Sequence, residues 1–353
     1  MRVGVLKGNG IGPEITSAVL QVLEATGLPL EWVHIPIADE AVERYGHPLP
    51  RQVVDALREV KVALKAPLIV NKGEGRLSCV QEDGSEVTYP SLNNAIRREL
   101  KLFVNPRPLR GIPGISGRYE NLDVVVMREV TEDVYVGWEH RIGDVAAQAI
   151  KLTTREAAVR VARYSFDYAR RNGRRKVSCL HKANVLNYTD GLFLRCCAEV
   201  AREYPDIEFD DYMIDAACYL IIKEPQRFDV VVTPNQYGDI LSDLGAGLVG
   251  SLGLAPGANI GEVASVFEAS HGAAPDIAGK GIANPVALLL SGALLLQHAG
   301  HGREAASVVR ATRAVLGEGK VLTRDLGGTA NTLALAGAIA DRVRASDPDR
   351  SSA

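Results

Sequence analysis

Short apolar runs alternate along the chain with longer segments in which apolar residues recur at helical spacing. The apolar runs predict strands over residues 2–6, 31–37, 62–64, 122–126, 176–180, 228–233 and 265–268. The helical spacing predicts helices over residues 13–26, 51–60 and 155–171. A regular alternation of strands and helices is typical of the α/β class.

The chain is long for a single domain. It has 353 residues, 46% of them hydrophobic, so we expect two domains. No internal repeat or long low-complexity linker marks a boundary between them. Two turn-rich stretches, 71–90 and 235–261, are candidate crossings between domains. The polar residues 346–353 predict a disordered tail.

Several sequence features bear on location and partners. The most apolar stretch, 286–296, is shorter than the roughly 20 residues that span a bilayer, and it predicts a buried helix. The start of the chain has no basic-then-apolar leader, so we expect a cytoplasmic protein.

Five cysteines without a CxxC pair predict reduced thiols. A net charge of −3 gives no general attraction to nucleic acid or to an anionic membrane, and we expect neither partner.

A glycine-rich segment, Gly8-Asn-Gly-Ile-Gly-Pro-Glu14, lies between a predicted strand and a predicted helix, where a Rossmann turn would lie. Its spacing departs from GxGxxG, because Pro13 follows the third glycine. Proline suits the first turn of a helix, and Glu14 favours the positive end of the helix dipole. We therefore predict a tight turn that caps the first helix.

Three acidic residues suggest a metal site. Asp239 and Asp243 follow the predicted strand 228–233, and a helix that begins near Gly238 would place them on one side. A divalent cation such as Mg²⁺ or Mn²⁺ would offset their repulsion. Asp215 stands on an apolar, helix-like stretch where a charge needs a partner. The alternative is that Asp239 caps the helix and Asp243 is solvated.

Arginines, a tyrosine and a lysine complete the candidate chemistry. Arg97, Arg107 and Arg128 lie in three separate motifs and could converge on a polycarboxylate, although each alone also fits a surface ion pair. Tyr135 and Lys182 each follow a predicted strand. A lysine near a metal and arginines would have its pKa lowered toward that of a working base, whereas an isolated one is ordinarily solvated.

Together these motifs resemble the β-decarboxylating dehydrogenases, the isocitrate and 3-isopropylmalate dehydrogenase family. The resemblance covers essentially the whole chain, through the glycine turn, Ser91-Leu-Asn93, Asn105-Pro-Arg107-Pro, 128–135, His181-Lys-Ala-Asn184, 235–243 and 268–285. It implies two α/β domains around a cleft rather than a classical Rossmann fold. Residues 1–102 and 252–353 would form the large cofactor-binding domain. Residues 103–251 would form the small domain, which carries the dimer contact and the metal and substrate site.

The resemblance implies oxidative decarboxylation of a 2-hydroxy acid to a 2-oxo acid and CO₂, in a homodimer that shares its active sites between subunits. Lys182 would be the base and Tyr135 the proton donor to the carbanion carbon. The carboxylate-binding residues would be Arg97, Arg107 and Arg128. The ligands of Mg²⁺ or Mn²⁺ would be Asp239, Asp243 and, from the second subunit, Asp215. Lys182 would also reach across to the other subunit's site.

The family builds its adenosine pocket from a loop, and the matching residues predict NAD. The implied cofactor contacts are Asn184, Glu268, His271, Gly272, Ala273, Ala274, Asp276, Ile277 and Asn284. A carboxylate at Asp276 accepts hydrogen bonds from ribose hydroxyls and repels a 2′-phosphate. NADP-using relatives tend to place lysine and tyrosine where this chain has Asp276 and Ile277.

The substrate prediction depends on Ser91 and Asn93. They match the Ser-x-Asn with which isocitrate-type members hold the third carboxylate, whereas isopropylmalate enzymes present an apolar surface there. Val130 interrupts the usual Arg-Glu-Asn, and segment 71–90 departs from ordinary isocitrate dehydrogenases. An isocitrate-like acid of a specialised pathway (phosphonomethylmalate, homoisocitrate, isopropylmalate or tartrate) therefore stays an alternative. A non-catalytic regulatory subunit is a lesser one, because such subunits generally lose the catalytic side chains present here.

Overall fold

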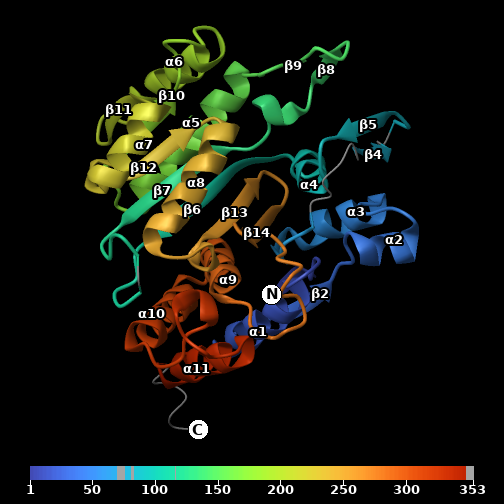
Figure 1. The fold of residues 1–353 in the computed structure, drawn as a ribbon, viewed down its shortest axis with the longest axis vertical. Helices are drawn as coiled ribbons and strands as arrows, with labels where there is room; N and C mark the ends of the chain where they lie inside the picture. The colour runs from blue at the N-terminus through green and yellow to red at the C-terminus, as the bar shows by residue number, and fades with distance from the viewer. Residues whose placement is uncertain (70–75, 81–82, 116, 347–353) are drawn as a thin grey trace.

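The computed structural model describes residues 1–69, 76–80, 83–115 and 117–346. Its centre is a ten-stranded mixed sheet in the order β11-β10-β12-β7-β6-β13-β14-β3-β1-β2. Figure 1 shows α5 to α8 around the end of this sheet that holds β10 to β12, and α1, α10 and α11 together at the opposite end of the molecule. The chain is therefore α/β, as predicted.

The sheet has two halves of different origin in the sequence. One half comes from the two ends of the chain: β1 (Arg2–Leu6), β2 (Glu31–His34), β3 (Val62–Lys65), β13 (Pro256–Gly261) and β14 (Ser265–Ala269). The other half comes from its middle: β6 (Leu102–Arg110), β7 (Asp123–Glu129), β10 (Lys176–His181), β11 (Glu208–Met213) and β12 (Val230–Thr233). The halves meet where β6 and β13 pair antiparallel, with Val104 opposite Ile260. Domain boundaries near residues 102 and 252 stay a prediction.

Helices and short elements surround the sheet. The helices are α1 (Gly12–Glu24), α2 (Asp39–Tyr45), α3 (Arg51–Val60), α4 (Leu92–Glu99), α5 (Arg155–Arg171), α6 (Thr189–Ala201), α7 (Ile214–Lys223), α8 (Asn235–Val249), α9 (Val286–His298), α10 (Gly302–Glu318) and α11 (Thr332–Ala345). Two hairpins stand apart from the sheet, β4 (Leu77–Val80) with β5 (Glu86–Tyr89), and β8 (Glu139–Ile142) with β9 (Ala146–Ala149). Short 3₁₀ turns are η1 (Val134–Val136), η2 (Pro225–Arg227), η3 (Leu252–Leu254) and η4 (Arg324–Leu326).

Most predicted elements are confirmed. Every predicted strand is present, although β2 ends at His34 and β12 begins at Val230. The helices predicted over 51–60 and 155–171 have those bounds. Residues 286–296 lie in α9, which is buried over most of its length and packs on β13 and β14. None of the described helices is long and apolar enough to cross a bilayer.

Segment 235–261 is mostly regular structure rather than turns, whereas a crossing between domains in this segment stays a prediction. Helix α8 occupies Asn235–Val249, and η3 and β13 follow it. Two of its glycines let the helix approach its neighbours closely. A Cβ atom at Gly238 would lie 2.7 Å from Arg128, and one at Gly245 would lie 2.2 Å from Leu109. Residues 71–75 and 81–82 of the other turn-rich segment, and residues 347–353 of the predicted tail, lie outside the described residues.

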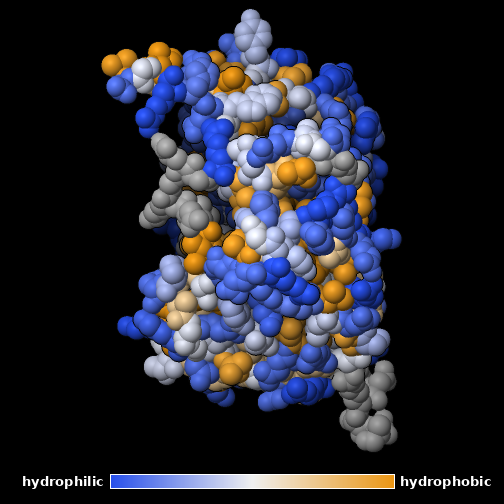
Figure 2. Space-filling view, turned by 90° about the vertical axis from the view of Figure 1, so that its right-hand side faces the viewer, coloured by the Kyte–Doolittle hydropathy of each residue, from blue (hydrophilic) through white to orange (hydrophobic). Residues whose placement is uncertain are grey.

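The surface and the thiols agree with the composition. Figure 2 shows a mainly hydrophilic face on which hydrophobic side chains are exposed in scattered small patches. All five cysteines lie in the described part of the chain and are free thiols; Cys218 alone is half-buried and the others are buried.

Candidate active site

A cavity of about 600 Å³ lies where the two halves of the sheet meet. Its walls come from α4, β6, β7, η1, α8 and the segment after β14. The predicted site residues that line it are Ser91, Asn93, Arg97, Arg107, Arg128, Tyr135, Asp239, Glu268, His271 and Gly272. The structure thus brings together residues from four distant parts of the sequence.

The three predicted arginines converge in this cavity with little exposure to solvent. Arg107 stands on β6 and Arg128 on β7, and the antiparallel register places Arg128 opposite Asn105. Arg107 donates to Asn105 Oδ1 at 2.6 Å, and Arg97 donates to Asn259 Oδ1 at 3.1 Å. Burial, together with the neighbouring Arg107, lowers the pKa of Arg128 to about 9. Burial also lowers the pKa of Arg107. Buried cations so close together favour an anionic ligand.

Asp239 connects these arginines to Tyr135. Its carboxylate accepts hydrogen bonds from Arg128 Nη1, from Arg107 Nη1 at 3.4 Å and from the Tyr135 hydroxyl at 2.6 Å. Burial opposes ionisation of Asp239, but Arg128 and Arg107 outweigh it and hold the pKa of this carboxyl below its usual value. Burial and the hydrogen bond to Asp239 raise the pKa of Tyr135 to about 12, so the phenol is protonated at neutral pH.

The predicted pair of acids shares one side of α8. Arg107 Nη1 lies 3.4 Å from Asp239 Oδ1 and 3.8 Å from Asp243 Oδ1. The helix begins at Asn235 rather than near Gly238, which leaves the i, i+4 relation intact. Two carboxylates on one side of a helix are oxygen donors of the kind that Mg²⁺ and Mn²⁺ accept. No group of three or more acidic, histidine or cysteine side chains is arranged for a metal within the described residues.

Asp215 and Lys182 lie outside this cavity and form an ion pair with each other. Lys182 Nζ donates to Asp215 Oδ1 at 2.5 Å, and the side chain of Asp215 is 65% exposed. Asp215 thus has the partner that a charge on this stretch was expected to need, but it is exposed, because β11 ends at Met213 and Asp215 falls in the first turn of α7. Neither residue, nor Asn184, lines the cavity in the described single chain.

A second cavity, of about 680 Å³, adjoins the first and shares His271 and Gly272 with it. The predicted cofactor residues that line it are His271, Gly272, Ala274, Ile277 and Asn284. Asp276 is exposed on the same loop. Asp325 lines this cavity too and was missed from sequence, since its contacts to Asn284 (2.9 Å) and Ser251 (2.7 Å) are long-range.

The glycine turn packs against the loop that lines this second cavity. Pro13 lies in the first turn of α1, as predicted, and Glu14 accepts hydrogen bonds from the backbone N–H groups of Gly281 and Ala283. Gly10 has φ +59°, and a Cβ atom there would lie 2.0 Å from the carbonyl oxygen of Ala273. The turn therefore packs against the predicted cofactor loop. That close backbone approach requires glycine.

Glu268 lies deep between the two halves of the sheet. Its carboxylate contacts Lys65 Nζ at 2.5 Å, Asn259 Nδ2 at 2.6 Å and Arg97 Nη2 at 3.6 Å. Burial opposes its ionisation, but Lys65 and Arg97 outweigh burial and lower the pKa of Glu268 to about 2. Lys65 and Asn259 were missed from sequence, because nothing local to either marks it as a partner of a residue so distant in the chain.

Three polar atoms of residues that line the cavity have no partner. Asn93 Oδ1, Ser270 Oγ and His271 Nε2 are buried, and no described residue forms a hydrogen bond with any of them. A buried polar atom without a partner is costly, so these atoms indicate ligand contacts. Ser91 differs, because its hydroxyl oxygen accepts a hydrogen bond from the N–H of Asn94 and caps α4. Its hydroxyl hydrogen is still free to donate toward the cavity.

Known proteins resemble this chain over nearly its whole length. The family model described as isocitrate/isopropylmalate dehydrogenase matches residues 2–342. A 3-isopropylmalate dehydrogenase of Archaeoglobus fulgidus is 46% identical over 96% of this chain and 98% of its own length. The NAD isocitrate dehydrogenase catalytic subunit 5 of Arabidopsis thaliana is 44% identical over 95% of this chain and 87% of its own.

A solved structure also resembles this chain over nearly its whole length. The isocitrate dehydrogenase of Methylococcus capsulatus superposes with a TM-score of 0.90 at 44% identity, and the match covers 97% of this chain and 99% of that one. The predicted fold, isopropylmalate dehydrogenase-like rather than classical Rossmann, is therefore confirmed.

Proposed function

We propose that this chain, which belongs to the isocitrate/isopropylmalate dehydrogenase family, is an NAD- and divalent-metal-dependent enzyme that oxidises and decarboxylates a 2-hydroxy acid of the isocitrate type. One observation carries the proposal. Three buried guanidinium groups, Arg97, Arg107 and Arg128, converge beside the Tyr135–Asp239 hydrogen bond in one cavity. Such a cavity suits an acid with several carboxylates.

The residues of this chain have separable tasks in the proposed reaction. Arg97, Arg107 and Arg128 bind and orient the substrate carboxylates in a site shielded from water. The neutral phenol of Tyr135 donates its proton to the carbon that loses CO₂, and Lys182 of the second subunit accepts the proton of the C2 hydroxyl.

Asp239, Asp243 and the partner's Asp215 would hold Mg²⁺ or Mn²⁺, which would supply polarisation of the C2 oxygen and of the adjacent carboxylate. The donor chemistry of this chain fits such an ion, because Asp239 and Asp243 share one side of α8. Both carboxylates lie within 4 Å of Arg107 Nη1.

The proposed cofactor is NAD. The cavity beside His271 has room for an adenosine group, and Asp276 lies exposed on the loop at its edge. A carboxylate in that position favours free ribose hydroxyls over a 2′-phosphate. The Arabidopsis thaliana relative is named as an NAD isocitrate dehydrogenase, which supports the same choice.

The proposed assembly is a dimer. The β8–β9 hairpin stands away from the sheet with both strands exposed, and Val145 at its tip is 92% exposed. An isolated two-stranded hairpin is marginally stable in water, so a partner that covers it would stabilise it. Lys182 and Asp215 also do not line the cavity of the described single chain. In a dimer, the second subunit would supply these two residues to the cavity. Because one relative is named a catalytic subunit, assembly with a different chain is the alternative.

A substrate panel tests the proposal. The purified chain is assayed for reduction of NAD⁺ and NADP⁺ with isocitrate, isopropylmalate, homoisocitrate, tartrate, malate and a phosphonomethyl analogue, in Mg²⁺, Mn²⁺ or a chelator. The highest kcat/KM for isocitrate with NAD⁺ and a metal supports the proposal. A highest kcat/KM for another acid moves the assignment to that acid. No turnover of any acid favours a regulatory subunit.

A further inference from the structure

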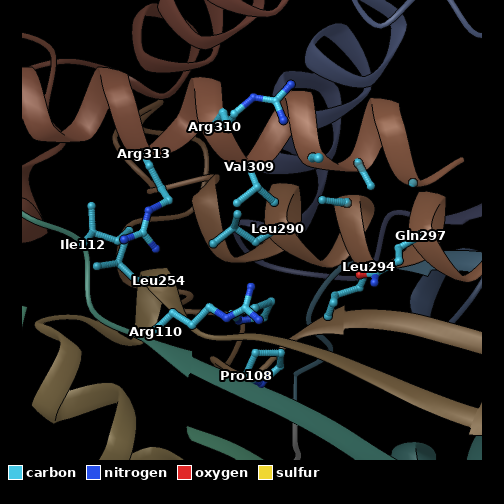
Figure 3. A pocket seen from close by; sticks show the side chains of 15 residues that line it. Pro108, Arg110, Ile112, Leu254, Leu290, Leu294, Gln297, Val309, Arg310 and Arg313 are labelled. Carbon is cyan, nitrogen blue, oxygen red and sulfur yellow. The ribbon is translucent and has the colours of Figure 1, made fainter. Parts of the chain in front are cut away.

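A separate cavity of about 300 Å³ lies behind strand β6 (Figure 3). Its floor is formed by β6 and β13, and its roof by α9 and α10. Most of its lining is apolar, with Ile112, Leu254, Leu290, Leu294 and Val309 around the space. The cavity is at the lower end of the size of small-molecule sites.

This cavity is distinct from the candidate active site. Arg107 and Pro108 are neighbours in β6, and successive side chains in a strand point to opposite faces. Arg107 faces the candidate active site, whereas Pro108 and Arg110 line the cavity behind it. The two cavities therefore share one strand as a wall.

Three arginines line the rear cavity, Arg110, Arg310 and Arg313. In Figure 3, Arg313 reaches down from α10 and Arg110 extends from β6 along the lower side of the space, whereas Arg310 points away from it. Arg110 Nε pairs with Asp123 at 3.1 Å, and a guanidinium has further N–H donors for a ligand. No described residue forms an ion pair with Arg313, and no described acidic side chain lines the cavity. An apolar space with cationic groups and no acid favours an anion with an apolar body.

We propose that the rear cavity binds a short aliphatic carboxylate, with its chain among the leucines of α9 and its carboxylate on Arg313 and Arg110. A zwitterion of the same shape binds poorly, because its ammonium group meets two cations and no carboxylate. An alcohol of the same shape lacks the charge that the arginines recognise. The ligand class is thus set by charge as well as by shape.

Calorimetric titration of the full chain tests this proposal with three matched probes, 4-methylpentanoate, leucine and 4-methylpentan-1-ol. The acid is expected to bind at least about tenfold more tightly than either of the others, because a hydrogen bond to a charged group contributes that much. Increasing salt weakens the binding of the acid. Equal affinity for the acid and the alcohol would overturn the proposal.

Three variants assign the binding to the rear cavity. Arg313→Gln is expected to weaken binding of the acid about tenfold. Arg310→Gln is the control, because it removes the same charge from α10 but its guanidinium points away from the cavity in Figure 3; we expect a change of about twofold or less. Ala306→Phe, at an exposed lining position, fills the space and abolishes binding while the lining of the candidate active site is unchanged.

Some results with these variants would contradict the proposal. Wild-type affinity in either Arg313→Gln or Ala306→Phe would show that the carboxylate binds elsewhere, the candidate active site included. Thermal melts of each variant check that the fold is retained. Because binding is measured directly, failure of this proposal is distinguishable from failure of the proposed enzyme activity.

Discussion

Replacing Glu268 by glutamine tests whether this residue is mainly a structural counter-ion. The side chain is buried against Lys65 and Arg97, and its pKa falls from an ordinary 4.5 to about 2. That difference corresponds to about 3 kcal/mol of stability at neutral pH. Removing one partner of a buried ion pair ordinarily costs about 3–5 kcal/mol, since the other charge is left uncompensated. We therefore expect Glu268→Gln to lower the free energy of unfolding by about 3 kcal/mol at pH 7.

The effect has a defined pH dependence. The pKa of Glu268 is lower in the folded chain than in the unfolded chain, so between pH 2 and pH 4.5 the unfolded chain binds the extra proton. The stabilisation is complete above about pH 4.5 and is lost as the pH falls toward 2. The difference between wild type and Glu268→Gln should shrink over that window.

Urea unfolding of both proteins at pH 7, 5 and 3 measures this difference. Glu262→Gln is the matched control, because Glu262 is exposed near the same strand and should change stability by about 0.5 kcal/mol or less. A difference below about 1 kcal/mol for Glu268→Gln at pH 7, or the same difference at pH 3 as at pH 7, would refute the reasoning. A raised KM for NAD⁺ with unchanged stability would instead support the cofactor role predicted from sequence.

Three further substitutions test the proposed chemistry. Tyr135→Phe should lower kcat by about 10²- to 10⁴-fold, because it removes the proton donor, while KM changes little; a near wild-type kcat in steady-state assays would exclude that role. Asp276→Lys should lower the ratio of kcat/KM for NAD⁺ to kcat/KM for NADP⁺ by about tenfold or more, because the carboxylate no longer repels the 2′-phosphate. An unchanged ratio would contradict the assignment of NAD preference to Asp276. Mixing inactive Lys182→Gln and Tyr135→Phe chains should restore about one quarter of wild-type activity, because half of randomly formed dimers carry one intact shared site; no recovery would argue against sharing.

Local periodicity predicted the fold well because most strands and helices here have one face or both faces buried. The run 228–233 and the amphipathic segment 155–171 carry that pattern in a single stretch of sequence. Helix α8 begins at Asn235, before the predicted start near Gly238, and two of its glycines, Gly238 and Gly245, although typical of turns, pack closely against Arg128 and Leu109. Glycine content alone does not distinguish a turn from a tightly packed helix.

The candidate site was predictable where motifs mark it and unpredictable where partners are distant. Arg97 and Arg107 stand in recognisable motifs, and both line the cavity. Asn259, which accepts a hydrogen bond from Arg97, lies 162 residues away in sequence, and nothing local marks it. Asp215 is exposed although its surroundings in sequence are apolar, because that stretch spans a strand end and a helix start and has no single buried face.

The geometry also changes which residue carries most of the argument for the proposed substrate. Ser91 caps α4 by accepting a hydrogen bond from the N–H of Asn94, so a serine at this position is explained by the helix whatever acid is bound. Asn93 has no such structural partner, because its buried side-chain oxygen lacks a hydrogen bond among the described residues. An amide can serve a polar substrate group as donor or acceptor, whereas it would leave an apolar isopropyl group opposite an unpaired polar atom. The proposal of an isocitrate-type acid therefore depends on Asn93 more than on Ser91.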